Sequence, residues 1–240
     1  MLAVATGRER ATLIADPRAG VEPAAARAFG DMVRRRLRRE PVAYILGRRW
    51  FREIELTVDR RALIPRPETE LLVEVAIELE PRTVLDLGTG SGAVALAIAT
   101  ELPHARVTAT DTSAAALELA RANAQRLSLD DRVGFVQASV PPGERFELTV
   151  ANLPYVREDE WDGLAPEITG FEPREALVAG PSGLEAIEAV AGAAGRGALA
   201  LEVGAGQAPA VAALVGEAGF GEIESRRDLA GIERVVTCRR

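Results

Sequence analysis

The fold is decided by Val84-Leu85-Asp86-Leu87-Gly88-Thr89-Gly90-Ser91-Gly92, which an apolar run over residues 93–99 follows. This pattern predicts a short buried strand, a glycine loop and then a helix. Glycine lets the backbone approach a ligand closely, and a helix that begins at such a loop directs its free N–H groups towards that ligand. The spacing Gly88-x-Gly90-x-x-Ala93 also fits the relaxed dinucleotide fingerprint, and a tight turn without a ligand would read the same way. The loop alone therefore leaves NAD and S-adenosylmethionine both open.

Two acidic residues beside the loop have positions that suit a cofactor. Asp86 lies two residues before the first glycine, where a carboxylate can meet a cationic ligand directly or through water. Asp111 ends the next predicted strand, where an acid can bind the two hydroxyls of a ribose. Asp111 can equally cap the helix that begins near Ser113, and the two roles are compatible. Asp86 favours S-adenosylmethionine, whose sulfonium and ammonium groups are cationic.

The tetrapeptide Asn152-Leu153-Pro154-Tyr155 follows a later predicted strand, at the edge where open α/β sheets bind ligands. Its chemistry suits methylation of an amide or aromatic amine, whose nitrogen lone pair is delocalised. The Asn152 side-chain oxygen and the Leu153 backbone carbonyl can each accept an N–H, which turns that lone pair towards a sulfonium methyl group. Pro154 stiffens the loop, and Tyr155 can pack on a planar substrate and exclude water. Positioning and desolvation would then supply most of the rate, although a plain turn would use similar residues.

A stiff polar segment, Pro65-Arg66-Pro67-Glu68-Thr69-Glu70, precedes the glycine loop. Its two prolines restrict the backbone, and Glu68 or Thr69 can begin the helix that follows as far as residue 79. Arg66 and Glu68 are therefore candidate residues for a substrate-binding pocket wall. Helix capping alone would also explain the acidic side chains.

Alternation of strands and helices from residue 82 onward predicts a doubly wound, mostly parallel, seven-stranded sheet. Strands are expected near 83–87, 106–111, 132–137, 147–151, 197–203, 221–226 and 233–238, and helices near 92–102, 113–127, 183–194 and 207–218. Upstream, the spacing predicts a short helical piece at 12–15, an amphipathic helix at 24–39 and a β-hairpin at 52–64. We expect a small helical N-terminal domain (1–47), a β-hairpin linker (48–67) and a main domain (68–240).

Composition excludes several classes of function. All 29 basic residues are arginine, so the chain has no P-loop lysine and no lysine for a pyridoxal Schiff base. A single histidine, His104, and a single cysteine, Cys238, argue against a histidine triad and a metal centre, and we expect no metal. The net charge of −7 argues against direct nucleic-acid binding. No apolar run is long enough for a membrane helix and no signal peptide is evident, so the expected location is the cytoplasm.

The chain resembles the bacterial release factor glutamine methyltransferase family (HemK-type, protein-(glutamine-N5) methyltransferases) over roughly residues 7–240. The matching motifs include the glycine loop and the tetrapeptide at 152–155, together with Glu40-Pro41-Val42-Ala43-Tyr44-Ile45-Leu46-Gly47, Leu63-Ile64-Pro65-Arg66-Pro67-Glu68-Thr69-Glu70, Phe171-Glu172-Pro173-Arg174-Glu175-Ala176-Leu177, Leu201-Glu202-Val203-Gly204 with Gln207, and Asp228-Leu229-Ala230-Gly231 with Arg234.

The resemblance implies a Rossmann-like class I methyltransferase that uses S-adenosylmethionine and releases S-adenosylhomocysteine. The implied reaction methylates the glutamine of the Gly-Gly-Gln motif in peptide chain release factors 1 and 2. It assigns the cofactor to Asp86, Gly88, Thr89, Gly90, Ser91, Gly92, Asp111, Ser139, Val140 and Asn152, and the glutamine to Asn152, Leu153, Pro154 and Tyr155.

Three departures from the family pattern stand out. Leu153 replaces the first proline of the usual Asn-Pro-Pro-Tyr, although the backbone carbonyl is kept. Ala138-Ser139-Val140 stands where an acidic and an aromatic residue often lie near the adenine. The N-terminal helical portion is expected to be short by one or more helices.

Three other functions compete with this interpretation. Ribosomal RNA adenine-N6 methyltransferases often carry Asn-Leu-Pro-Tyr, but they are typically basic and have a C-terminal helical RNA-binding part. An NAD-linked oxidoreductase would leave that tetrapeptide without a purpose. A non-catalytic cofactor-binding protein would leave Asp86, Asn152 and Tyr155 without one.

Overall fold

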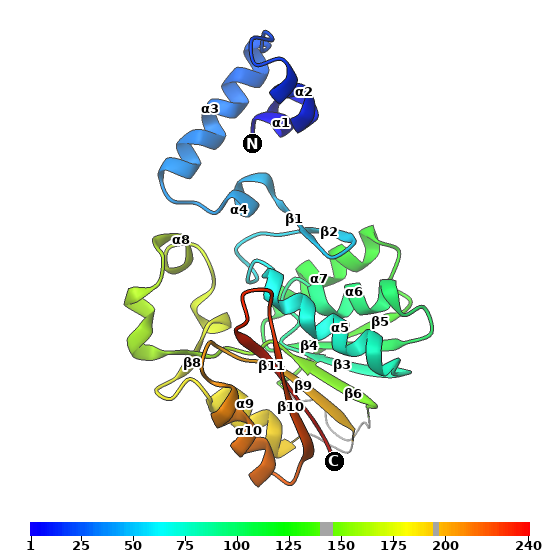
Figure 1. Ribbon diagram of the computed structural model, residues 1–240. Coiled ribbons are helices and arrows are strands. Elements are labelled where there is room, and N and C mark those ends of the chain that lie inside the picture. Colours follow the sequence, from blue (N-terminus) through cyan, green and yellow to red (C-terminus); the bar gives the residue numbers. More distant parts are fainter. Residues whose placement is uncertain (140–145, 194–196) are drawn as a thin grey trace.

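A seven-stranded sheet forms the centre of the molecule in the computed structural model, which describes residues 1–139, 146–193 and 197–240. Its strand order is β10-β11-β9-β6-β3-β4-β5 (Figure 1). Five strands of this sheet (β3, β4, β5, β6 and β9) run parallel to one another. The strand β11 pairs antiparallel with both β9 and β10. The strands are β3 (Thr83–Leu87), β4 (Arg106–Asp111), β5 (Val133–Gln137), β6 (Leu148–Ala151), β9 (Ala198–Glu202), β10 (Gly221–Arg227) and β11 (Glu233–Arg239). The predicted doubly wound, mostly parallel sheet is confirmed.

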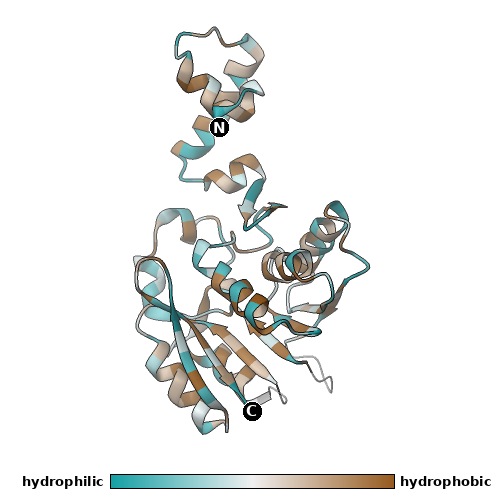
Figure 2. Cartoon of the chain, turned by 45° about the vertical axis from the view of Figure 1, so that its right-hand side comes forward, coloured by the Kyte–Doolittle hydropathy of each residue, from teal (hydrophilic) through white to brown (hydrophobic). Residues whose placement is uncertain are grey.

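Helices cover both faces of this sheet, which is why its central strands read as continuous apolar runs. Val84 packs into one core cluster, whereas its neighbours Leu85 and Leu87 pack into another on the opposite face. The helices of the first face are α5 (Glu70–Leu79), α6 (Ala93–Glu101) and α7 (Ala114–Arg126); those of the second are α9 (Glu185–Ala193) and α10 (Ala208–Glu217). Figure 2 shows hydrophobic colouring along the central strands, between the two helical layers.

The helix α6 is apolar all round because it is buried all round. Every residue from 93 to 99 is buried, beneath α5 and against β4. Burying an aliphatic side chain stabilises a fold by about 1.5–3 kcal/mol. This burial fixes the helix, and with it the glycine loop that leads into it.

The N-terminal helices stand apart from the sheet (Figure 1). They are α1 (Leu2–Thr6), α2 (Arg10–Ala15), α3 (Pro23–Leu37) and α4 (Val42–Leu46). No residue of α1, α2 or α3 is fully buried, whereas Tyr44 and Ile45 of α4 are. The helix expected at 24–39 ends two residues early, at Leu37, because Arg39 has a left-handed backbone. The chain then reverses, and the Glu40 side chain pairs with Arg35 at 2.6 Å. Only α4 therefore joins the core of the main body.

The hairpin expected at 52–64 was placed wrongly. Its strands are β1 (Arg48–Phe51) and β2 (Ile54–Thr57), joined by a turn in which Arg52 has a φ of 47°. The alternating burial of Ile54 and Leu56 marks β2 correctly, but it does not say whether the partner strand lies before or after. Residues 59–62 form a turn instead, which the Ala62 N–H closes by donating to the Asp59 carbonyl. No second strand follows, and the Ile64 N–H donates to the Glu172 carboxylate.

Short elements fill the long connection between β6 and α9 and the start of α5. They are η1 (Pro67–Thr69), β7 (Val156–Arg157), η2 (Glu158–Gly163), α8 (Pro166–Thr169), η3 (Arg174–Ala176) and β8 (Val178–Gly180). None of the helices in the described ranges is long and apolar enough to cross a membrane.

Candidate active site

A cavity of about 360 Å³ opens at the carboxyl ends of β3, β4 and β6. This is the edge where open α/β sheets bind ligands, and the volume falls in the range of small-molecule sites. Eleven of the residues proposed from the sequence line it: Arg66, Asp86, Gly88, Thr89, Gly90, Ser91, Asp111, Ser139, Asn152, Leu153 and Pro154. Three others, Glu68, Gly92 and Tyr155, are not on its lining, and Val140 lies outside the described residues.

The glycine loop brings the two predicted motifs into contact. Gly88 has a φ of 70°, and a Cβ atom there would lie 3.2 Å from the Leu153 side chain and 3.5 Å from the Asn152 carbonyl oxygen. At Gly90, with a φ of 55°, a Cβ atom would meet only Ala62, at 3.7 Å. Gly92 serves packing instead, since its Cβ would lie 3.0 Å from Leu96 inside the core.

Asp86 lines the cavity and is almost fully buried. Its Oδ2 atom accepts hydrogen bonds from the Thr89 hydroxyl at 2.6 Å and from the Ala95 N–H at 3.2 Å. Burial raises the pKa of Asp86 to about 7, although these two hydrogen bonds act in the opposite direction. A buried carboxyl group held in this way is a strong acceptor for a cationic ligand that enters the cavity.

Asp111 holds the rim of the cavity. One carboxylate oxygen accepts from the Gly90 N–H and the other from the Ser113 N–H, both at 2.9 Å. Ser113 in turn caps α7 by accepting from the Ala116 N–H. A carboxylate has about four acceptor positions, so two hydrogen bonds leave room for ribose hydroxyls. Ser113 is therefore the helix cap, and Asp111 holds that cap residue rather than capping the helix itself. The ribose role stays a prediction.

Asn152 is oriented by a partner that the sequence reasoning did not identify as such. Its Nδ2 atom donates to the Thr69 hydroxyl at 3.0 Å, just before α5 begins. With the amide nitrogen tied back, the amide oxygen remains as the acceptor on a residue that lines the cavity. The sequence indicated Thr69 only as a possible start of the next helix. Its hydrogen bond with Asn152 joins residues 83 positions apart, so no local pattern predicts it.

Tyr155 is held beneath the loop rather than on the cavity lining. Its hydroxyl lies 3.5 Å from the Glu202 carboxylate, and burial raises the pKa of the tyrosine well above its usual range. The backbone N–H donates to the Leu177 carbonyl at 3.1 Å, and the backbone carbonyl accepts from the Gln207 side chain at 2.9 Å. These contacts fix the end of the tetrapeptide on three sides.

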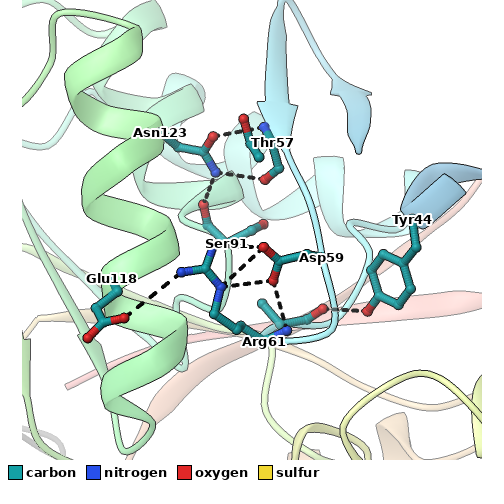
Figure 3. Close-up of polar contacts among 8 residues, drawn as sticks. Tyr44, Thr57, Asp59, Arg61, Ser91, Glu118 and Asn123 are labelled. Carbon is teal, nitrogen blue, oxygen red and sulfur yellow. Dashed lines mark hydrogen bonds and ion pairs between the residues drawn. The ribbon is translucent and has the colours of Figure 1, made fainter. Parts of the chain in front are cut away.

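Another wall of the cavity comes from the segment after the hairpin, where Arg61, Ala62, Leu63, Pro65 and Arg66 line it. Glu172 anchors this wall, because its carboxylate accepts from the Ile64 N–H at 3.0 Å and pairs with Arg66 at 2.6 Å. Arg61 lies between Asp59 and Glu118, as Figure 3 shows. The motif around Glu172 was noted in the sequence, but nothing there indicated that it faces Ile64.

One buried asparagine joins the hairpin to the glycine loop. Asn123 on α7 accepts from the Thr57 N–H at 2.8 Å and donates to the carbonyls of Thr57 at 3.0 Å and Ser91 at 2.9 Å (Figure 3). Tyr44 of α4 adds a hydrogen bond from its hydroxyl to the Ala62 carbonyl, at 2.7 Å. Hydrogen bonds of Asn123 therefore join the glycine loop to the hairpin.

Two further segments complete the lining and were not predicted from the sequence. One contributes Pro173, Glu175 and Ala176, and the other is the face of α9 that carries Ala186, Ala189 and Val190. No group of histidine, cysteine or acidic residues suited to a metal ion occurs in the described part of the chain.

Two protein-family models match this chain. The Methyltransferase small domain matches residues 67–167, and the PrmC N-terminal domain matches residues 1–47. A protein named release factor glutamine methyltransferase from Bordetella pertussis is 48% identical over 241 residues, which cover 95% of this chain and 88% of that protein. Proteins of the same name from Pseudomonas aeruginosa and Caulobacter vibrioides are 42% and 38% identical, covering 98% of this chain and 89% and 86% of theirs.

Two solved structures with the same fold differ in what they are described with. The Mtq2–Trm112 complex of E. cuniculi, described as methylating the termination factor eRF1, aligns with a TM-score of 0.53 at 25% identity, covering 75% of this chain and 99% of that chain. The catalytic domain of human Mettl16 with an RNA hairpin aligns with a TM-score of 0.62 at 14% identity, covering 77% and 74%. The second likeness concerns the fold alone.

Proposed function

The chain belongs to the release factor glutamine methyltransferase family, and on that premise we propose that Asn152, Leu153 and Pro154 present the glutamine of a release factor to the cofactor cavity. It is an S-adenosylmethionine-dependent methyltransferase, and its reaction methylates a glutamine of release factors. The acceptor that we propose is the side-chain nitrogen N5 of the glutamine in the Gly-Gly-Gln motif, in release factors 1 and 2 alike.

The cavity suits S-adenosylmethionine in shape and charge. Asp86 offers a buried carboxylate to a positive charge, Asp111 offers acceptor positions at the rim, and Gly90 leaves space where a side chain would intrude. Ala116 and Ala138 add small apolar side chains to the lining, on which a flat ring can pack. When bound, S-adenosylmethionine supplies a methyl group on a positively charged sulfur and leaves as S-adenosylhomocysteine.

Two acceptors orient the substrate amide. The Asn152 Oδ1 atom and the Leu153 backbone carbonyl each accept one N–H of the glutamine amide, which turns the nitrogen lone pair towards the methyl group. With S-adenosylmethionine bound, transfer would form a nitrogen–carbon bond as the carbon–sulfur bond breaks, and the methylated nitrogen would lose one proton when the product becomes accessible to water. These groups contribute by orientation and by excluding water, so no dedicated base is needed.

The observation that supports this assignment is the hydrogen bond from Asn152 to Thr69 beside the glycine loop. It ties back the donor end of the amide and leaves an acceptor on a residue of the cavity lining. Tyr155 takes a supporting role here, because its contacts with Glu202, Leu177 and Gln207 hold the loop from below.

Asn152→Ala tests the assignment. We expect the turnover number to fall about a hundredfold while the affinity for S-adenosylhomocysteine changes little, because the side chain orients substrate rather than cofactor. Leu153→Ala is the matched control on the neighbouring residue: it keeps the backbone carbonyl and should retain most of the activity. Near-normal turnover by the Asn152 variant would remove this mechanism.

Methyl transfer from labelled S-adenosylmethionine identifies the acceptor. A purified release factor, its Gln→Ala variant in the Gly-Gly-Gln motif, and ribosomal RNA are compared side by side. Label on the wild-type factor alone supports the proposal. Label on RNA would favour the adenine-N6 reaction instead, which the names of the relatives argue against. Location in the cytoplasm stays a prediction.

A further inference from the structure

The turn between β10 and β11 carries a leucine that the mechanism above does not use. The turn spans residues 228–232 and belongs to a motif noted in the sequence. Leu229 has an exposed fraction of 110%, against 76% for Leu37, the next of the exposed large apolar residues in the described ranges. Single exposed apolar side chains are common on protein surfaces, so the exposure alone indicates no role. The construction and the place of this turn are what point to one.

Hydrogen bonds hold the turn in one shape. The Asp228 N–H donates to the Ile232 carbonyl at 2.8 Å, and the Gly231 N–H donates to the Asp228 carbonyl at 2.9 Å. One oxygen of the Asp228 carboxylate accepts from the N–H groups of Ala230 and Ile232, at 2.9 and 3.0 Å. The other oxygen accepts from Arg234 Nε at 3.0 Å. A partner that binds the exposed leucine therefore loses little affinity to ordering of the backbone around it.

The turn stands at the same edge of the sheet as the candidate active site. Val235 of β11 pairs with Glu202 of β9, and the Val203 N–H then donates to the Arg234 carbonyl at 2.8 Å. The strand β9 pairs on its other side with β6, which Asn152 follows. Neighbouring strands lie about 4.8 Å apart, so the base of the turn is about 10 Å from Asn152 across the sheet. Figure 1 shows the turn, in dark red, at the end of the hairpin on the side of the N-terminal helices.

A protein that places a glutamine at Asn152 reaches this turn. A standard protein–protein interface buries about 800 Å² on each partner, which corresponds to a disc of about 16 Å radius. The tip of the turn lies about two residues, or roughly 7 Å, beyond its base, and therefore falls inside such a disc centred on Asn152. Leu229 is not part of the cavity lining, so a small ligand in the cavity does not cover it. The protein substrate is the partner that this position fits.

We propose that Leu229 is a docking contact for the release factor, and that it enters an apolar depression on that protein beside the methylated glutamine. The inference rests on the proposed place of the glutamine at Asn152. Contact with the factor removes the leucine side chain from water, which stabilises the complex. Leu229 therefore serves binding of the protein substrate and takes no part in the chemical step.

Leu229→Ser tests the inference. We expect the Kd for a purified release factor, measured by calorimetry on enzyme saturated with S-adenosylhomocysteine, to rise about tenfold. The KM for the factor should rise in parallel, while the turnover number at saturating factor and the affinity for S-adenosylhomocysteine stay within about twofold. The melting temperature should not change, because the side chain is fully exposed. Leu229→Met, which keeps an apolar side chain of similar volume, should bind the factor nearly as the wild type does.

Glu224→Ser is the matched control. It removes another exposed side chain from the same hairpin, on β10 and away from the turn, and should leave the Kd for the factor unchanged. Wild-type binding and KM in Leu229→Ser would overturn the inference, as would a loss confined to the turnover number or to cofactor affinity. A wild-type dimer in sedimentation that Leu229→Ser dissociates would overturn it too, because a second copy of the chain would then occupy the turn.

The label assay separates this inference from the proposed function. Weaker binding by Leu229→Ser, together with label on a factor whose Gly-Gly-Gln glutamine is replaced by alanine, would support the docking contact and contradict the proposed acceptor. Label confined to the wild-type factor, together with unchanged binding by Leu229→Ser, would do the reverse.

Discussion

Gly90 and Gly92 share a left-handed backbone but serve different ends. An alanine at Gly90 would place its Cβ 3.7 Å from Ala62 on the cavity side, whereas one at Gly92 would meet Leu96 at 3.0 Å in the core. Both substitutions cost about 1–2 kcal/mol in backbone strain. We expect Gly90→Ala to weaken binding of S-adenosylhomocysteine in calorimetry with a modest loss of stability. Gly92→Ala should lower the melting temperature more than Gly90→Ala does. Equal effects on stability would contradict this division of roles.

The buried carboxyl group of Asp86 should make the stability of the ligand-free protein depend on pH. Its pKa is raised to about 7 by burial, so between about pH 4 and 7 the folded protein binds a proton that the unfolded chain has released. The free energy of unfolding of the ligand-free protein therefore falls as pH rises through this window. Asp86→Asn should flatten that decline, and it should also weaken cofactor binding severely. Melting temperatures at several pH values, with and without S-adenosylhomocysteine, check both effects; an unchanged pH slope in the variant would contradict them.

At the scale of elements, Asn123 ties three segments together. Asn123→Ala removes three hydrogen bonds and leaves the buried carbonyl of Ser91 without that donor. We expect a loss of about 2–3 kcal/mol in the free energy of unfolding, and weaker cofactor binding because the glycine loop loses its support. Arg126→Ala is the matched control on the same helix, since it removes only an exposed contact with the hairpin at Glu55. Similar losses in both variants would argue against the connection.

The elements that were predicted correctly are those with a local signal. Strands such as β3 are buried on both faces, so their apolar runs stand out between the turns. The hairpin failed because alternating Ile54 and Leu56 fix a strand and its inward face but not its partner. The segment between β6 and α9 has no periodic pattern, since its short turns pack by individual contacts.

The same limit applies to the candidate site. The glycine loop and the tetrapeptide are contiguous motifs, and most of their residues line the cavity. The contacts of Thr69, Glu172 and Asn123 join residues far apart in the chain, and no spacing rule predicts them. Sequence patterns therefore predicted much of the cavity lining, whereas the contacts that hold those residues in place needed the tertiary structure.

At the scale of the whole molecule, the boundary between the helices without buried residues and the buried core lies before α4, not after it. The helices α1 to α3 bury no residue fully, whereas Tyr44 of α4 is 6% exposed and hydrogen-bonds Ala62 on the cavity wall. Contacts of α3 with the main body include the pairs of Arg36 and Arg39 with Glu167, which are surface ion pairs of small energetic value.

Removal of residues 1–40 should therefore leave a folded protein with nearly unchanged affinity for S-adenosylhomocysteine. Methyl transfer to an intact release factor should fall through a higher KM, because we expect the lost helices to contact the protein substrate. Removal of residues 1–47 should lower the melting temperature by several degrees more, since it takes Tyr44 and Ile45 out of the core. Calorimetry and steady-state kinetics on the two truncations distinguish these effects. If the shorter deletion abolishes cofactor binding, the N-terminal helices contribute to the cavity itself, and the division at α4 is wrong.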